Sequence, residues 1–120
     1  MTAMDPTRIA AAGILETWSG HAWTNGVQLD SIPDFTEIHV RTRNSVYAIQ
    51  VIEGASREVL VRGGRFFPEW TPAHLAGASM GGSFLKVGGV YVGFKLEIVS
   101  GDRTTITSRA ESISVHPPSP

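Results

Sequence analysis

Apolar and polar side chains alternate with a period of two through much of residues 35–115. This period is typical of β-strands that bury one face and expose the other. At the start of the region, Ile38 and Val40 alternate with charged residues and a histidine. The expected strands cover residues 35–42, 46–52, 58–67, 90–98, 103–107 and 112–115. The last two segments are either two short strands or one strand that is broken in the middle.

Two of these segments have features of their own. Residues 46–52 are apolar on both faces, which is typical of a central strand that is covered on both sides. In residues 58–67 the pair Gly63-Gly64 interrupts the pattern. Glycines inside a strand favour a β-bulge or a sharp bend, so we expect one bent strand here.

Residues 68–88 lack a clear period. They are rich in glycine, proline and aromatic residues, and they predict a long loop with a short helical turn near residues 72–76. Loops of this length are uncommon inside a compact domain and are often functional. We therefore expect a binding site in this region, together with the preceding glycine pair.

The two ends of the chain differ from the middle. Apolar residues at positions 11, 14, 15 and 18 share one face of a helix, which we expect over residues 6–17. The alternative is a flexible tail whose residues 14–18 pair as an edge strand. Asn25-Gly26 favours a tight hairpin between the residues that flank it. The prolines of residues 116–120 predict a disordered tail.

The fold class that follows is all-β and mainly antiparallel. No helix-sized segment separates the expected strands, which excludes a parallel α/β sheet. We expect a small barrel or a compact sandwich of about five or six strands, with a short N-terminal helix. Residues 34–115 are expected to form the β domain, and residues 1–33 to pack on its core as a helix and hairpin extension.

Composition narrows the possible functions. The chain has 120 residues, enough for one hydrophobic core, and no cysteine, which excludes disulfides, thiolate metal sites and a cysteine nucleophile. Charged residues make up 18% of the chain, below the roughly 25% of typical domains, so we expect a surface that either contains many Ser, Thr and Gly or is partly covered by a second copy or a partner. The formal charge of −1 provides no overall attraction to nucleic acid or to an anionic membrane.

The sequence gives no sign of a membrane partner. No apolar run reaches the ~20 residues that cross a bilayer. Residues 9–15 resemble a weak signal-peptide core, but Asp5 precedes them, Glu16 ends them and no cleavage motif follows. We therefore expect a cytoplasmic protein.

Three motifs resemble catalytic or ligand sites, and each lacks part of what its chemistry needs. Ser79 lies in a G-x-S-x-G match, but no strand–turn–helix context is expected around it. The glycine-rich residues 81–89 lack the G-K-[S/T] order of a phosphate loop. Glu37 and His39 share a strand face without the further ligands of a metal site. We therefore favour a non-catalytic protein without a metal or cofactor.

Arginines gather between positions 41 and 65, and aromatic residues follow them in the glycine- and proline-rich segment. Arginine side chains bind anions, and aromatic side chains often anchor protein interfaces. Phe66 and Trp70 have the alternative role of plugging one end of a barrel. The candidate binding residues are Arg41, Arg43, Arg62, Arg65, Phe66 and Trp70.

Two functions from different classes fit these residues. In the first, the protein is an interaction module that binds a protein partner or a second copy through the 63–88 segment. In the alternative, a small β-barrel binds an anionic ligand or nucleic acid through an arginine-rich strand face. The low net charge and the scarcity of lysine favour the first.

Overall fold

The computed structural model describes residues 24–81 and 84–118, and most of these residues lie in β-strands. These residues contain ten strands and one short 3-10 turn, η1 (Leu29–Ser31). In chain order the strands are β1 (Gly26–Gln28), β2 (Glu37–Thr42), β3 (Val46–Glu53), β4 (Glu58–Gly63), β5 (Phe67–Ser79), β6 (Lys86–Val87), β7 (Gly89–Tyr91), β8 (Lys95–Ser100), β9 (Arg103–Ile106) and β10 (Ala110–His116). The expected all-β class is confirmed.

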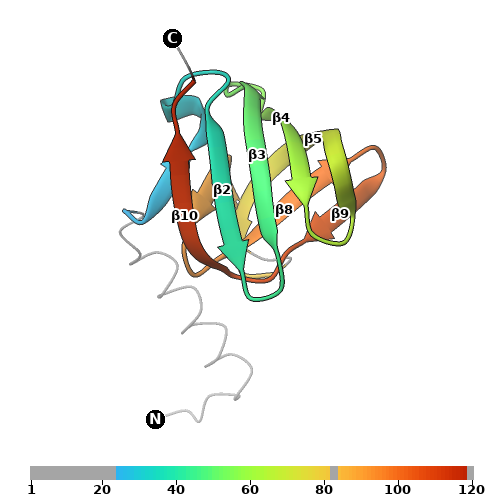
Figure 1. Cartoon of the computed structure of the whole chain (residues 1–120). Helices are drawn as coiled ribbons and strands as arrows, with labels where there is room; N and C mark the ends of the chain where they lie inside the picture. The colour runs from blue at the N-terminus through green and yellow to red at the C-terminus, as the bar shows by residue number, and fades with distance from the viewer. Residues whose placement is uncertain (1–23, 82–83, 119–120) are drawn as a thin grey trace, which may run out of the picture.

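Eight of these strands form one antiparallel sheet (Figure 1). The strands β10, β2, β3, β4, β5, β8 and β9 lie side by side in that order, and β6 pairs with β5. The other two strands, β1 and β7, pair with each other. The large sheet is not closed into a barrel but folds over on itself, so the protein has the compact sandwich-like architecture that was one of the two expected.

β5 belongs to both layers of the sandwich. Its residues 67–74 pair with β4, and its residues 74–79 pair with β8. A register shift between Leu75 and Gly77 lies in the second of these ladders, where a bulge bends the strand. The front layer in Figure 1 is therefore β10, β2, β3, β4 and the start of β5, and the back layer is the end of β5 with β8 and β9.

The main apolar core lies between the two layers. Alternate residues of β2, β3 and β4 are buried from the front, and alternate residues of β8 are buried from the back. The side chains that are almost completely buried there include Ile38, Val40, Ile49, Val51, Val61, Leu75, Leu96 and Ile98. The period of two expected at residues 35–42 is confirmed by this burial.

Residues 58–67 form a hairpin, so the expectation of a single strand is wrong, although the β4–β5 pairing has a register shift between Val61 and Gly63, where a bulge or bend was expected. β4 ends at Gly63, a turn covers residues 64–66, and β5 begins at Phe67. Gly63 and Gly64 have φ values of 124° and 63°, which glycine adopts without a steric penalty. The glycine pair therefore reverses the chain.

The long loop expected at residues 68–88 is also wrong, because most of it is β5. The helical turn expected near residues 72–76 is wrong for the same reason. Pro68 and Pro72 lie in the part of β5 that pairs with β4 alone. A proline is tolerated in a strand with one unpaired side, since no second neighbour requires its missing N–H.

The strand expected at residues 90–98 is divided in two. β7 ends at Tyr91, and β8 begins at Lys95 after a turn in which the Phe94 N–H donates to the Tyr91 carbonyl at 3.3 Å. The break allows the two halves to pair with different partners, β1 and β5.

The ends of the chain differ from expectation where they are described. Gly26 begins β1, which pairs with β7. The expected preceding hairpin arm, residues 21–23, and the helix expected over residues 6–17 lie outside the described residues. The expectation of a disordered tail from residue 116 is wrong for His116, because this residue ends β10 and pairs with Glu37.

The described part of the chain contains no helix with the length and apolar character needed to span a membrane.

Tyr91 is a buried phenol that packs with Ala78 and Phe94. Burial, and to a lesser extent the nearby Asp30 carboxylate, raise the pKa of its hydroxyl above the ordinary value of 10.0. The folded protein then holds this proton more tightly than the unfolded chain, so the resulting stability is complete below about pH 10 and is lost as the pH rises above it.

We therefore expect the free energy of unfolding to fall as the pH rises above about 10, and to fall less steeply in Tyr91→Phe. Urea unfolding of both proteins across this range, with a reference near pH 8, measures the difference. Parallel pH profiles for the two proteins would contradict the prediction.

Candidate functional site

β3 is the middle strand of the front layer, and its two faces differ. The inward residues Tyr47, Ile49 and Val51 are buried, whereas the outward Val46 is 60% exposed. The expectation that residues 46–52 are covered on both sides is therefore wrong within the described chain. The outward face of this central strand is open to solvent at Val46 and partly buried at Ala48, Gln50 and Ile52.

We call the solvent side of the front layer the outer face. The strand register places its side chains in rows that cross five neighbouring strands. Its members are Ser112, Ser114 and His116 of β10, Glu37, His39 and Arg41 of β2, Val46, Ala48, Gln50 and Ile52 of β3, Glu58, Leu60 and Arg62 of β4, and Trp70 and Pro72 of β5.

The outer face contains two shallow apolar hollows. One, of about 310 Å³, has Val46, Ala48 and Trp70 in its lining. The other, of about 440 Å³, lies along Leu60 and Pro72. The first hollow lies toward the end of β4, where Arg62 and Gly63 also line it, and the second lies toward the start of β4, where Glu58 lines it.

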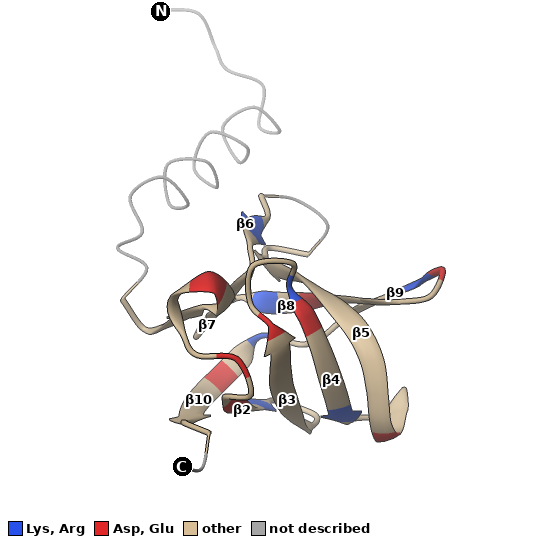
Figure 2. Cartoon of the chain, turned by 90° about the horizontal axis from the view of Figure 1, so that it is seen from above, with Lys and Arg blue, Asp and Glu red and all other residues tan. Residues whose placement is uncertain are grey.

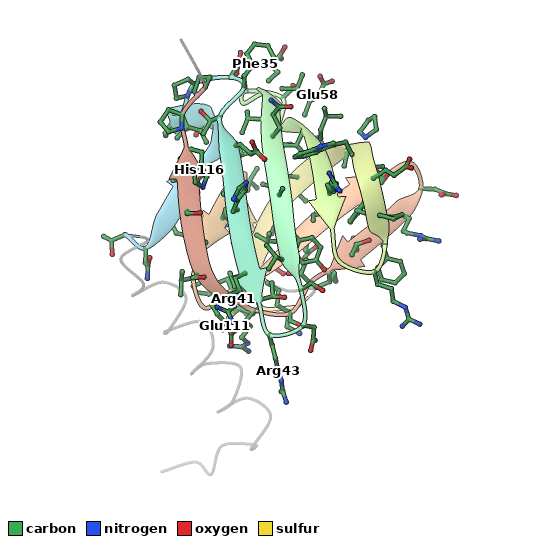
Figure 3. The ribbon with its side chains drawn as sticks, viewed as in Figure 1. Phe35, Arg41, Arg43, Glu58, Glu111 and His116 are labelled. Carbon is green, nitrogen blue, oxygen red and sulfur yellow. The ribbon has the colours of Figure 1, made fainter. Side chains whose placement is uncertain are left out.

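Charged residues lie at the two ends of the outer face. Arg41 and Arg62 are close to the turns that end β2 and β4, whereas Glu37 and Glu58 begin these two strands. Figure 3 shows Arg41 at the lower end and Glu58 at the upper end, and Figure 2 shows β4 with an acidic start and a basic end. The outer face therefore has a basic pole beside the first hollow and an acidic pole beside the second.

A polar corner occupies the β10 side of the face. His39 Nε2 lies 3.1 Å from Glu37 Oε1, and its ring centre lies 4.5 Å from that of His116. The Ser114 hydroxyl in turn lies 3.0 Å from His116 Nε2. Within residues 24–81 and 84–118, no group of three metal-ligating side chains is present, so the Glu37–His39 pair is a local ion pair at most.

The four predicted arginines do not form one patch. Arg41 and Arg62 lie on the outer face, on β2 and β4. Arg43 and Arg65 lie in the β2–β3 and β4–β5 turns, beyond the basic pole. The structure thus separates two arginines that belong to the face from two that belong to the end of the sandwich.

The two predicted aromatic residues are both at the surface. Trp70 is 41% exposed beside Arg62, and Phe66 is 51% exposed in the β4–β5 turn, where the Arg103 guanidinium carbon lies 5.3 Å from its ring centre. The aromatic residue that fills the core is Phe67, which is 2% exposed. Plugging the sandwich is therefore the role of Phe67 and not of Phe66 or Trp70.

Ser79 is not placed as a nucleophile. It is completely buried at the end of β5, and its hydroxyl accepts a hydrogen bond from the Gly81 N–H at 3.1 Å. A hydrolase elbow needs the serine exposed between a strand and a helix, and no helix follows in the described residues.

Comparisons of the chain with protein families, with curated proteins and with solved structures found no match. The outer face must therefore be interpreted from its own geometry. Sequence reasoning missed Val46, Leu60 and Pro72 as members of this face. The apolar outward positions of residues 46–52 were the signal, but they were assigned to burial because the sequence alone does not show what covers a strand.

Proposed function

We propose that the protein is a non-catalytic interaction module whose outer face docks against the outer face of a second copy. The observation that carries this proposal is the exposure of Val46, 60%, on the middle strand of the front layer. Removing apolar surface from water is favourable by ~25 cal/mol per Å². Trp70, in the same hollow, is the kind of large side chain that anchors interfaces.

The charge arrangement favours a second copy over an unrelated partner. In a two-fold dimer the same surface is used twice, so it must be complementary to itself. A two-fold axis that lies between the faces and runs across the strands sets the basic pole of each copy against the acidic pole of the other. The first hollow of each copy then faces the second hollow of the other, as in two sheets that pack face to face.

The size of the face sets the strength of the association. Five strands about 4.8 Å apart, with about six residues each at a rise of about 3.3 Å, give a face of roughly 20 by 20 Å. Such a face lies near the lower limit for specific interfaces, so we expect a reversible dimer with a dissociation constant of about 10–100 µM.

Val46→Lys is expected to raise this dissociation constant at least about tenfold, because each copy then brings an ammonium group into the contact that Val46 makes as an apolar side chain. Sedimentation velocity between about 5 and 500 µM measures the change, at concentrations that bracket the expected constant. Val87→Lys is the matched control, since Val87 is 51% exposed on β6 and lies outside the outer face.

Two results would overturn the proposal. One is a wild-type protein that stays monomeric up to about 500 µM, well above the expected dissociation constant. The other is a dimer that Val46→Lys and Val87→Lys weaken equally, which would place the interface on another surface. Amide chemical shifts that change on dilution along β3, β4 and β5, and not along β8 and β9, would support it.

A further inference from the structure

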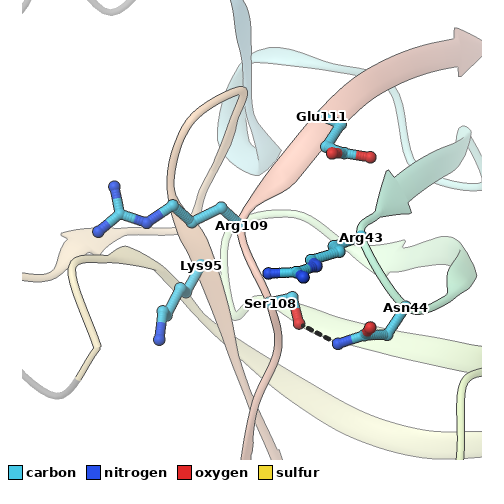
Figure 4. A pocket seen from close by; sticks show the side chains of 6 residues that line it. All are labelled: Arg43, Asn44, Lys95, Ser108, Arg109 and Glu111. Atoms are coloured by element: carbon cyan, nitrogen blue, oxygen red, sulfur yellow. Dashed lines mark hydrogen bonds between the residues drawn. The ribbon is translucent and has the colours of Figure 1, made fainter.

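A cleft opens at the end of the sandwich beside the basic pole, where three segments meet. These are the β2–β3 turn, the start of β8 and the connection between β9 and β10 (Figure 4). The cleft has a volume of about 480 Å³, within the range of small-molecule sites. Its lining residues are Arg43, Asn44, Lys95, Ser108, Arg109 and Glu111.

The lining has an excess of positive charge. Arg43, Lys95 and Arg109 are cationic, whereas Glu111 is the one carboxylate among the lining residues. In the part of the chain that the structure describes, no carboxylate lies within 4.0 Å of the charged nitrogens of these three cations. An excess of cationic side chains around one cleft raises the local positive potential, which favours a bound anion.

The walls of the cleft are tied together. The Asn44 side-chain amide donates to the Ser108 hydroxyl at 2.9 Å, which links the β2–β3 turn to the β9–β10 connection (Figure 4). Thr42 accepts from the Ser45 N–H at 3.1 Å, and Thr107 donates to the Ser108 carbonyl at 2.7 Å, so each wall is also held locally. The cationic groups are therefore carried on segments whose backbones are fixed.

The chemistry of the lining indicates the class of ligand. Amide, hydroxyl, guanidinium and ammonium groups are hydrogen-bond donors, and such donors suit a ligand with several oxyanion oxygens. No aromatic residue lines the cleft, so a nucleobase has no ring on which to stack. We propose that this cleft binds a small phosphorylated molecule through its phosphate groups. The site is distinct from the outer face and needs no second copy.

Inorganic pyrophosphate is a suitable probe, because it carries the proposed chemistry and nothing else. Isothermal titration at low salt is expected to give a dissociation constant of about 10⁻⁴ M that weakens as salt is added. Arg43→Ala and Arg109→Ala are each expected to weaken binding about fivefold, since each removes one charge-assisted contact in an open site. Glu111→Gln is expected to tighten binding about threefold, because it removes the repelling carboxylate.

Arg62→Ala is the matched control, because Arg62 is an exposed arginine of the outer face that does not line the cleft. It is expected to leave the pyrophosphate affinity unchanged. All variants are compared by thermal unfolding and in a Val46→Lys background, which keeps the measurement independent of dimerisation.

Three results would overturn the inference. They are the absence of pyrophosphate binding at low salt, an equal loss of affinity in Arg62→Ala and Arg43→Ala, and weaker binding in Glu111→Gln. A short single-stranded oligonucleotide and citrate complete the test. If the oligonucleotide binds at least about tenfold more tightly than pyrophosphate, the ligand of the cleft is nucleic acid and not a small molecule. If citrate binds more tightly than pyrophosphate, the cleft recognises carboxylate groups and not phosphate groups.

Discussion

Gly63→Ala is expected to lower the free energy of unfolding by about 3 kcal/mol or more. A Cβ atom added at Gly63 would lie 2.1 Å from the Val46 carbonyl oxygen and 2.9 Å from the Tyr47 Cα. Both are backbone atoms of the neighbouring strand, so no side-chain movement relieves the clash. The residue also has a φ of 124°, a conformation that alanine rarely adopts. The variant must therefore separate β4 from β3 at the hairpin.

Gly101→Ala separates the clash from the backbone conformation. Gly101 has a φ of 63° in the turn between β8 and β9, and an added Cβ would meet nothing within 4 Å. It is expected to cost only about 1 kcal/mol, the ordinary penalty of a left-handed alanine. Urea unfolding followed by circular dichroism measures both variants. Equal losses of unfolding free energy in the two variants would show that the close approach of β3 to Gly63 adds nothing to the cost of Gly63→Ala.

Thr107→Val is expected to cost about 2 kcal/mol. The Thr107 side chain is buried, and its hydroxyl oxygen accepts a hydrogen bond from the Leu96 N–H at 3.0 Å while it donates to the Ser108 carbonyl. Valine has nearly the same shape and no acceptor, so a buried backbone donor of β8 loses its partner. The connection between the two edges of the sheet then becomes looser.

The matched control for this substitution is Thr105→Val. Thr105 is buried in β9, and its hydroxyl makes no hydrogen bond to any described residue. Removing that hydroxyl is expected to be neutral or slightly stabilising, because an apolar group suits the site better. Urea unfolding of the two variants measures the difference. Equal losses of unfolding free energy in Thr107→Val and Thr105→Val would contradict the prediction.

The strands that follow a strict alternation were predictable from the sequence, and the strands shared between layers were not. β2 has one buried and one solvent-facing side throughout, so its period of two is visible at Ile38 and Val40. β5 changes its neighbour from β4 to β8 part-way along, so its burial pattern also changes and shows no single period. Pro68 and Pro72 gave this segment a composition typical of a loop. A strand with one unpaired side can nevertheless contain prolines.

The candidate sites were predictable only in part, for a related reason. Arg62 and Trp70 were found because arginine and aromatic residues are conspicuous in a sequence. Lys95 and Arg109 were missed because they line the same cleft as Arg43 only after the chain has returned from β9 to β10. Neighbours so distant in sequence are not visible in the sequence alone. Arginines that are close in sequence, such as Arg41 and Arg43, are in turn separated between the face and the end of the sandwich.

The pairing of β10 with β2 has a consequence for how this protein reaches its fold. Neighbours from β2 to β5 are joined by short turns and can form as soon as they are synthesised, whereas β2 must wait for nearly the whole remaining chain before its second edge is paired. Contacts between distant parts of a chain slow folding, and an unpaired strand edge invites association with other chains. The newly made protein is therefore most prone to aggregate in the interval before β10 leaves the ribosome and pairs with β2.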